Sequence, residues 1–239
     1  MDSNVSISFN RKDSIPKYIE QATKDIADHF KSRRGYIPQF CSMVQNSKRW
    51  NMRNITSKLQ SWKQAFSRIA ETGGIIRIIE SAFSNCNTDK DIHKLRGAIV
   101  EGLIIGCHGG SVNLAHDNYG WGAQVIIKKD STNQEVKYVC TENKHAECGR
   151  RMTVDFGYWN GKHGKFYECK VQPEGIGCKE IMYMRHLADE LAEHSISHEM
   201  LFVSACPSDD LKIRLEEWGL SPRFKAIGTS ELKEMMRAS

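Results

Sequence analysis

The hydrophobic pattern changes character about halfway along the chain. In the first half, apolar residues recur at intervals of three and four, which predicts helices over 14–34, 56–71, 75–83 and 88–105. Ser14 followed by Pro16, and Thr88 followed by Asp91, are signals of helix N-termini. Gly35–Pro38 is expected to break the chain after the first helix, and Gly106 to end the fourth.

In the second half, short apolar or alternating runs replace the helical period. They predict strands over 121–128, 136–140, 152–159, 165–171, 200–205 and 224–227. Helices are expected over 178–193, 208–218 and 230–237. Hairpins combined with a crossover helix indicate the α/β class. We therefore expect a central mixed β-sheet flanked by helices and preceded by a helical N-terminal region.

Composition narrows the class of protein further. The chain has 239 residues, of which 40% are hydrophobic and 26% charged, and this is typical of a soluble domain. No apolar run reaches the ~18 residues of a membrane span, and no basic segment precedes an apolar one at the N-terminus. The eight cysteines form no CxxC pair, so we expect reduced thiols in a cytoplasmic protein without a membrane partner. Neither GxxxxGK[ST] nor GxGxxG is present, which argues against a nucleotide-driven motor.

The charge is divided unevenly along the chain. Residues 1–85 carry fourteen Lys/Arg against seven Asp/Glu, whereas the remainder is slightly acidic. Between Phe30 and Ala70 there is no acid at all beside nine bases, which are Lys31, Arg33, Arg34, Lys48, Arg49, Arg53, Lys58, Lys63 and Arg68. Such a field attracts polyanions, although a solvated helix face is the simpler alternative. We expect 1–85 to be a basic region that engages DNA or dimerises, and 86–239 to be the core.

Candidate chemistry lies in the hairpin formed by 152–159 and 165–171. If the four residues 160–163 form the loop between the strands, residue 159 pairs with 164. Asp155 then lies opposite Glu168. Two facing acids, about 5 Å apart, destabilise a sheet unless a cation lies between them, and a hard divalent cation suits their oxygen atoms. Lys170 follows on the same face as Glu168. Glu101, in the otherwise apolar run LRGAIVEGLIIG, is a further candidate acid.

The order of these residues resembles the PD-(D/E)XK nuclease superfamily, whose fold is restriction-endonuclease-like. The resemblance covers about Thr88–Ile227. It consists of a helix with Glu101, a strand with Asp155 and a next strand with Glu168-Cys169-Lys170, followed by a helix and a strand. Val154 stands where the motif nominally has a proline.

The resemblance implies metal-dependent hydrolysis of phosphodiester bonds. Asp155, Glu168 and the backbone carbonyl of Cys169 would bind Mg²⁺, with Mn²⁺ as a substitute, and Lys170 would position or activate water. Glu101 would be a supporting acid or a ligand of a second ion. Gln172 is the candidate for the scissile phosphate, with Lys179 and Arg185 as alternatives. We expect an endonuclease of double-stranded DNA in restriction or defence, acting as a homodimer or with a partner subunit.

Three other hypotheses stay open. The chain could be a catalytically silent nuclease-fold subunit that binds nucleic acid, or a nuclease acting on RNA. Cys140, His145 and Cys148, with Cys107 and His108 upstream, could form a zinc site, although the spacing is poor for structural zinc. Cysteine catalysis finds no support beyond the presence of thiols, since Cys169 points away from the acid pair.

Overall fold

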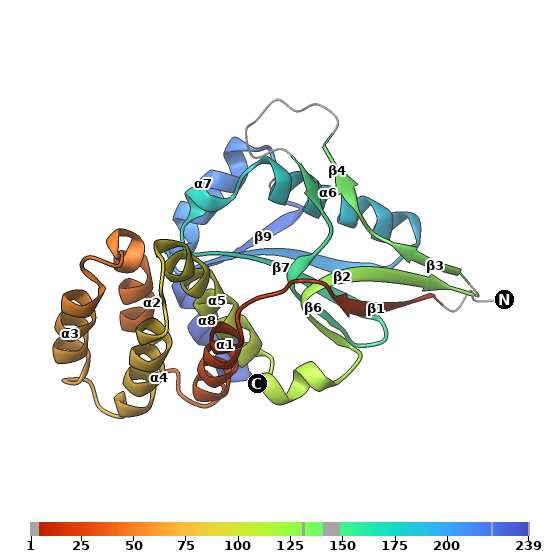
Figure 1. Ribbon diagram of the computed structural model, residues 1–239. Helices are drawn as coiled ribbons and strands as arrows, with labels where there is room; N and C mark the ends of the chain where they lie inside the picture. Colours follow the sequence, from red (N-terminus) through yellow and green to blue (C-terminus); the bar gives the residue numbers. More distant parts are fainter. Residues whose placement is uncertain (1–4, 131, 141–148, 221, 239) are drawn as a thin grey trace. The chain divides into compact units, whose positions relative to one another are not determined.

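The centre of the fold is a mixed β-sheet. In the computed structural model, which describes residues 5–130, 132–140, 149–220 and 222–238, the sheet order is β1-β2-β6-β7-β8-β9, and β3 also pairs with β2 (Figure 1). The β1–β2, β2–β3, β2–β6 and β6–β7 pairs are antiparallel and β8–β9 is parallel. The strands are β1 (Val5–Arg11), β2 (Tyr119–Lys129), β3 (Thr132–Glu135), β6 (Val154–Trp159), β7 (His163–Lys170), β8 (Ser197–Ser204) and β9 (Phe224–Ile227). The expected α/β class with a mixed sheet is confirmed.

Helix α6 (Cys178–Glu193) supplies an apolar face to the sheet. Ile181, Met184, Leu187 and Leu191 recur at intervals of three and four and are fully buried in one cluster with side chains of β2, β7 and β8. Helix α7 (Ser208–Glu217) adds Leu211 and Leu215 to the same cluster. The sheet and these helices therefore bury a continuous core, which fixes the strand that carries Glu168 and Lys170.

The remaining helices pack on one another. They are α1 (Lys17–Phe30), α2 (Ile37–Asn46), α3 (Ile55–Phe66), α4 (Gly73–Ser84), α5 (Asp89–Cys107) and α8 (Thr229–Ala238). Helix α5 begins at the expected capping box, in which Thr88 Oγ1 accepts from Asp91 N–H and the Asp91 carboxylate accepts from Thr88 N–H. Glycines of α5 allow close packing on α1, because a Cβ at Gly102 would come within 2.9 Å of Thr23 O.

The chain divides into two compact units. The sheet unit comprises 1–14, 114–203 and 209–227, and the helical unit comprises 15–113, 204–208 and 228–239. The expected functional division between 85 and 86 stays a prediction. The boundaries of the two compact units fall at other residues. Strand β1 belongs to the sheet unit, whereas α5 belongs to the helical unit. None of the helices in the described parts of the chain is long and apolar enough to cross a membrane.

Several elements differ from expectation for local reasons. Strand β1 was not predicted, although Val5, Ile7 and Phe9 alternate along it, because three apolar positions are a short signal. The break expected at Gly35–Pro38 is shorter than predicted, because α2 already begins at Ile37. Pro38 lies in the first turn of α2, where a backbone N–H has no partner within the helix. Of the strand expected over 136–140, only Tyr138–Val139 forms a strand, β4, which pairs with β5 (Arg150–Arg151) in a second sheet. Strand β3 ends just before this segment, at Glu135.

A buried histidine lies within the helical unit. His29 is only 7% exposed, and its Nε2 hydrogen-bonds with the hydroxyl of Tyr36. Burial, with a smaller contribution from Arg33, lowers the pKa of His29 from 6.5 to about 4. The folded protein therefore resists protonation at this residue more strongly than the unfolded chain does.

Because of His29, we expect the unfolding free energy of the protein to fall at acidic pH. The contribution of His29 to stability is complete above pH 6.5 and is lost as the pH falls from 6.5 towards 4, because the unfolded chain binds the proton first. Between pH 7 and pH 5 the wild type should lose about 2 kcal/mol more unfolding free energy than His29→Gln. Urea unfolding of both proteins at the two pH values measures this difference, and equal losses would contradict the assignment.

Candidate active site

The hairpin of β6 and β7 has the predicted register. Trp159 pairs with Gly164 and Phe156 with Tyr167, so the same register continued by one residue places Asp155 opposite Glu168. Both acids are buried, with Asp155 9% exposed and Glu168 fully enclosed. Two carboxylates are therefore held face to face, away from water, where their mutual repulsion is poorly screened.

An arginine lies between these two acids. Nη2 of Arg151, at the end of β5, is 3.0 Å from Asp155 Oδ1 and 2.5 Å from Glu168 Oε2. One oxygen of each acid thus converges on a single cationic nitrogen. Arg151 carries no sequence signal for this contact, because it precedes Asp155 by four residues in a segment without a regular period.

The second oxygens of the pair are also bound. Asp155 Oδ2 accepts from the backbone N–H of Cys169 at 2.7 Å, and Glu168 Oε1 accepts from Lys170 Nζ at 2.6 Å. The acid pair and Lys170, which were predicted as neighbours, therefore lie together. The role expected of the Cys169 carbonyl stays a prediction, since the hydrogen bond described here involves its N–H.

Glu180 is a third buried acid of this cluster. Its Oε1 lies 3.4 Å from Lys170 Nζ and 3.8 Å from Arg151 Nη1, and its Oε2 accepts from Gly177 N–H at 3.2 Å. The hydrogen bond from Gly177 N–H to Glu180 caps the first turn of α6. Glu180, three residues after Gly177, supplies only the acid half of a capping box, because glycine has no side chain to accept in return. Three acids and two bases consequently share one buried network.

The network separates the pKa values of the two facing acids. Burial raises the pKa of Glu168 to about 7, with Asp155 adding to the effect and Arg151 opposing it. Burial also opposes ionisation of Asp155, but Lys170, Arg151 and the Cys169 N–H hold the pKa of Asp155 below its ordinary value. Burial alone would lower the pKa of Lys170, whereas Glu168 and Asp155 together raise it. Lys170 is therefore a cation at neutral pH.

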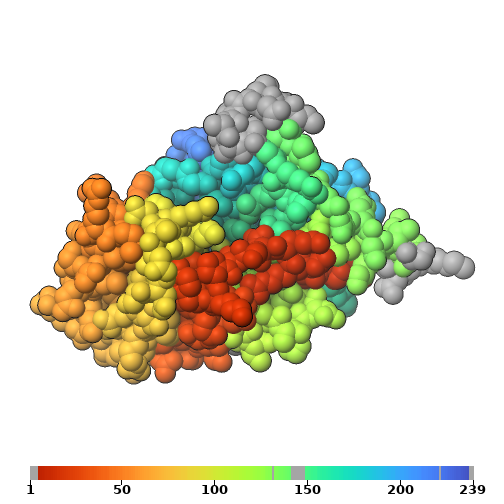
Figure 2. Space-filling view, viewed as in Figure 1, coloured from red at the N-terminus to blue at the C-terminus, as the bar shows by residue number. Residues whose placement is uncertain are grey.

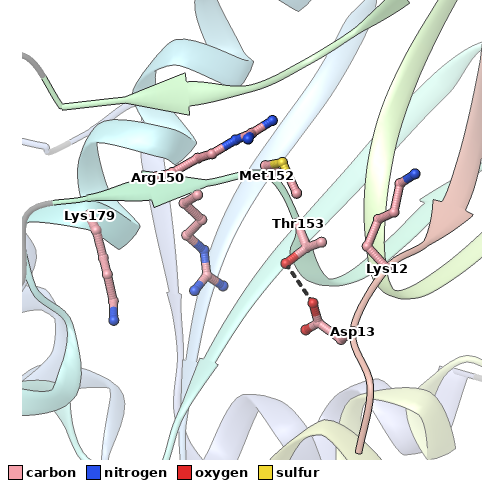
Figure 3. Close-up of a pocket in the computed structure, with 7 residues that line it drawn as sticks. Lys12, Asp13, Arg150, Met152, Thr153 and Lys179 are labelled. Carbon is pink, nitrogen blue, oxygen red and sulfur yellow. Dashed lines mark hydrogen bonds between the residues drawn. The ribbon is translucent and has the colours of Figure 1, made fainter.

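A hollow of about 330 Å³ adjoins this cluster in the sheet unit (Figure 3). Its lining residues are Lys12, Asp13, Arg150, Arg151, Met152, Thr153 and Lys179. Arg151 contacts both acids and also lines the hollow. The acid pair therefore lies directly behind the wall of the hollow that Arg151 forms. No carboxylate lies within ion-pair distance of Lys12 or Arg150 in the described residues, whereas Lys179 lies 3.8 Å from Glu180.

Asp13 brings a further acid to the hollow from the far end of the sequence. Its Oδ1 accepts from Thr153 Oγ1 at 3.2 Å, and burial together with the charge of Asp155 raises the pKa of Asp13. The N–H groups of Lys12 and Asp13 both donate to Gly122 O at 3.0 Å. Gly122 has a φ of +53°, and a Cβ there would meet the Asp13 side chain at 2.7 Å. No sequence signal links Asp13 to Thr153, since 140 positions separate them.

The other predicted residues have different surroundings. Glu101 is half-buried on α5 in the helical unit, whereas the acid pair belongs to the sheet unit. Gln172 is half-buried just beyond β7, and its backbone carbonyl accepts from Gly175 N–H. Arg185 donates to the carbonyls of Trp218 and Gly219 at the end of α7, a structural contact. The catalytic roles expected of Glu101 and Gln172 stay predictions.

The zinc hypothesis falls mostly on residues that are not described. His145 and Cys148 lie outside the described residues, while Cys140 is buried in the sheet unit and Cys107 in the helical unit. Within the described parts of the chain, no group of three or more His, Cys, Asp and Glu side chains is placed to hold a metal ion. A cation at Asp155 and Glu168 would therefore take its remaining ligands from backbone oxygen and water.

Comparison with known proteins leaves the family open. No protein-family model matches the chain, and no curated protein matches it. One similar solved structure is that of protein VC1899 from Vibrio cholerae, with 14% identity and a TM-score of 0.40. The match covers 98% of this chain and 57% of that one, so this chain spans little more than half the length of that protein. A likeness at this level carries no argument about fold or function.

The buried network predicts strong coupling between Arg151 and Glu168. Arg151→Met should lower the unfolding free energy at pH 8 by about 3 kcal/mol, because it removes the cation that contacts both buried acids. Adding Glu168→Gln should restore at least about 1 kcal/mol of that loss, since the repulsion is then removed as well. Urea unfolding of the two single variants and the double variant measures the coupling.

Arg150→Met is the matched control for this cycle. Arg150 is the exposed neighbour of Arg151 and has no ion pair in the described residues, so its replacement should change stability by less than about 0.5 kcal/mol. Strictly additive effects of Arg151→Met and Glu168→Gln would show that the guanidinium does not hold the acid pair together.

Proposed function

We propose that this chain is a metal-dependent endonuclease that hydrolyses DNA phosphodiester bonds. The observation that carries the proposal is the convergence of one oxygen from Asp155 and one from Glu168 on a single cationic nitrogen, beside Lys170. Buried acids arranged in this way create a binding position for a cation, and clusters of strongly perturbed acids and bases are typical of functional sites.

The donor set of this position fits a divalent cation. Asp155 Oδ1 and Glu168 Oε2 already contact one positive centre, so Nη2 of Arg151 stands where an ion would bind. Mg²⁺, or Mn²⁺ in its place, would be held by these two oxygens and by the Cys169 carbonyl. When bound, such an ion lowers the pKa of a water molecule and stabilises negative charge on phosphate oxygens. Arg151 must leave its place between the acids for this to happen.

Lys170 acts as a charged donor in this scheme. Its ammonium group is 2.6 Å from Glu168 and 3.4 Å from Glu180, and these neighbours keep it protonated at neutral pH. A protonated lysine cannot accept a proton, so it orients the attacking water or stabilises charge that develops on the phosphate. Glu180 positions Lys170 through their contact. Glu101 and Gln172 keep the supporting roles proposed from the sequence.

The charge of the adjoining hollow supports a phosphodiester substrate. Lys12, Arg150 and Lys179 extend from its walls in different directions in Figure 3, which suits an extended polyanion better than a single small anion. Asp13 faces the same space. We propose double-stranded DNA as the polymer and a restriction or defence role. A homodimer or a partner subunit would supply the second active site needed to cut both strands.

A second candidate function is a catalytically silent subunit that binds nucleic acid. The observation that favours it is Arg151 itself, because a guanidinium bound to both acids neutralises them without a metal ion. A nuclease acting on RNA is a variant of the main proposal, because the same groups can act on either phosphodiester. Cleavage assays separate the three functions.

Cleavage of supercoiled plasmid with Mg²⁺, and separately with EDTA, tests the main proposal. Asp155→Asn and Lys170→Ala should each lower the cleavage rate at least about 100-fold, because each removes a group that acts on the transition state. Lys165→Ala is the control, since Lys165 lies on the same strand but pairs with Glu199. It should cut like the wild type.

Different outcomes of this assay assign different functions. Cleavage that EDTA abolishes and both variants lose supports the proposal. Cleavage of RNA alone would transfer the activity to that polymer. Binding of nucleic acid without cleavage, with either Mg²⁺ or Mn²⁺, would establish the silent subunit instead.

A further inference from the structure

The helical unit has an exposed basic surface around α3. We define the basic surface by its exposed cations, which are Lys48, Arg49, Arg53, Lys58 and Arg68. No carboxylate forms an ion pair with any of them in the described parts of the chain. The cause lies in the sequence, because no acid occurs between Phe30 and Ala70. Of the five cations only Arg68 has an acid, Glu71, at a spacing of three or four residues.

Several surface cations elsewhere in the protein form an ion pair with an acid, although Lys12 and Arg150 do not in the described residues. Lys24 contacts Glu20 at 2.7 Å, Lys212 contacts Asp209 at 2.8 Å, and Arg214 contacts Glu217 at 2.8 Å. Lys63 of α3 also forms a pair, with Glu80 of α4 at 2.8 Å. The basic surface differs from the rest of the protein in that its unpaired cations lie together in a stretch of sequence without acids.

Few residues of helix α3 are buried. Of its twelve residues only Ile55 and Phe66, the first and the last, are buried. The exposed residues between them include Lys58, Gln60 and Gln64, whose side chains have no hydrogen-bond partner in the described residues. Figure 2 shows this helix, in orange, at the surface. The exposed residues of α3 thus include a cation and two amides but no acid, which suits contact with phosphates and base edges.

A buried arginine adjoins the same surface. Arg96 of α5 is 7% exposed, and its Nε donates to Ser47 Oγ at 2.7 Å. Ser47 is fully buried and directly precedes Lys48 and Arg49. No carboxylate pairs with Arg96 in the described residues, and burial lowers its pKa, which reflects the cost of enclosing the charge. A buried cation without a paired acid lowers the stability of the free protein, but it attracts an anion that binds nearby.

One acid lies at the edge of this surface. Asp89 accepts from the backbone N–H of Met52 at 2.7 Å, and with Asn51, Met52 and Arg53 it lines a hollow of about 440 Å³. The Asp89 carboxylate is used in holding the loop that leads into α3, and it forms no ion pair with Arg53. The basic surface thus keeps its positive charge beside this acid.

We propose that the basic surface, with Arg96 beneath it, binds the backbone of double-stranded DNA, and that α3 presents Gln60 and Gln64 to the groove. Charge complementarity selects the partner, because no acid of the described residues forms an ion pair with these cations. The proposal takes only the identity of the polymer from the proposed nuclease function. It requires no cleavage and involves none of the residues around Asp155.

Fluorescence anisotropy with a labelled DNA duplex tests this surface. All proteins carry Asp155→Asn, which prevents cleavage, and the buffer contains EDTA. The test variant is Arg49→Gln/Arg53→Gln/Lys58→Gln. The control variant, Lys128→Gln/Lys129→Gln/Lys162→Gln, removes the same charge from exposed residues of the sheet unit. The test variant should bind at least about ten-fold more weakly, and its salt dependence should fall by about two to three in log–log slope. The control should lose less than about three-fold.

Arg96→Met separates binding from folding. It should lower the log–log salt slope by about one, while the unfolding midpoint of the free protein stays equal or rises, because an uncompensated charge is removed. Equal DNA affinities of the test and control variants would overturn the proposal, and so would binding of RNA but not DNA. A wild type that binds through this surface but never cuts DNA would remove the nuclease function and leave the surface intact.

Discussion

The contact on which the sheet unit depends is that of Arg151 with two buried carboxylates. Asp155 and Glu168 face each other across the hairpin, and neither can be ionised there without a nearby cation. The guanidinium of Arg151 provides that cation by approaching one oxygen of each acid. Lys170 and the Cys169 N–H bind the other two oxygens, so the whole pair is enclosed in hydrogen bonds.

Elements distant in the sequence meet around this contact. Helix α6 adds Glu180, strand β5 adds Arg151, and the segment after β1 adds Asp13 through Gly122 and Thr153. Each contributes a charge, and each is anchored by backbone hydrogen bonds or by the core. The cluster therefore has a structural role, which is to satisfy buried charges, and in our proposal it also binds a cation and acts on phosphate. Arg151 connects the two, because its guanidinium occupies the position in which the proposed cation would bind.

The sequence was sufficient for the local parts of this arrangement. Alternation along β6 and β7 and the length of their loop predicted the register that brings Asp155 opposite Glu168, and the helical period predicted α6 from Cys178 to Glu193. It was not sufficient for Arg151 and Asp13, because their contacts depend on how separate segments are packed. Burial of Glu168 on a central strand, which raises its pKa, likewise follows from the tertiary fold. Strand β1 was missed because its partner β2 lies more than a hundred residues away.

Binding of Mn²⁺, followed by electron paramagnetic resonance of the free ion, tests most directly whether the acid pair is a cation site that Arg151 occupies. The wild type should bind Mn²⁺, Asp155→Asn should bind it at least about ten-fold more weakly, and Arg151→Met should bind it more tightly than the wild type. Equal affinities of the wild type and Asp155→Asn would contradict the account, as would an Arg151→Met variant that binds no better than the wild type.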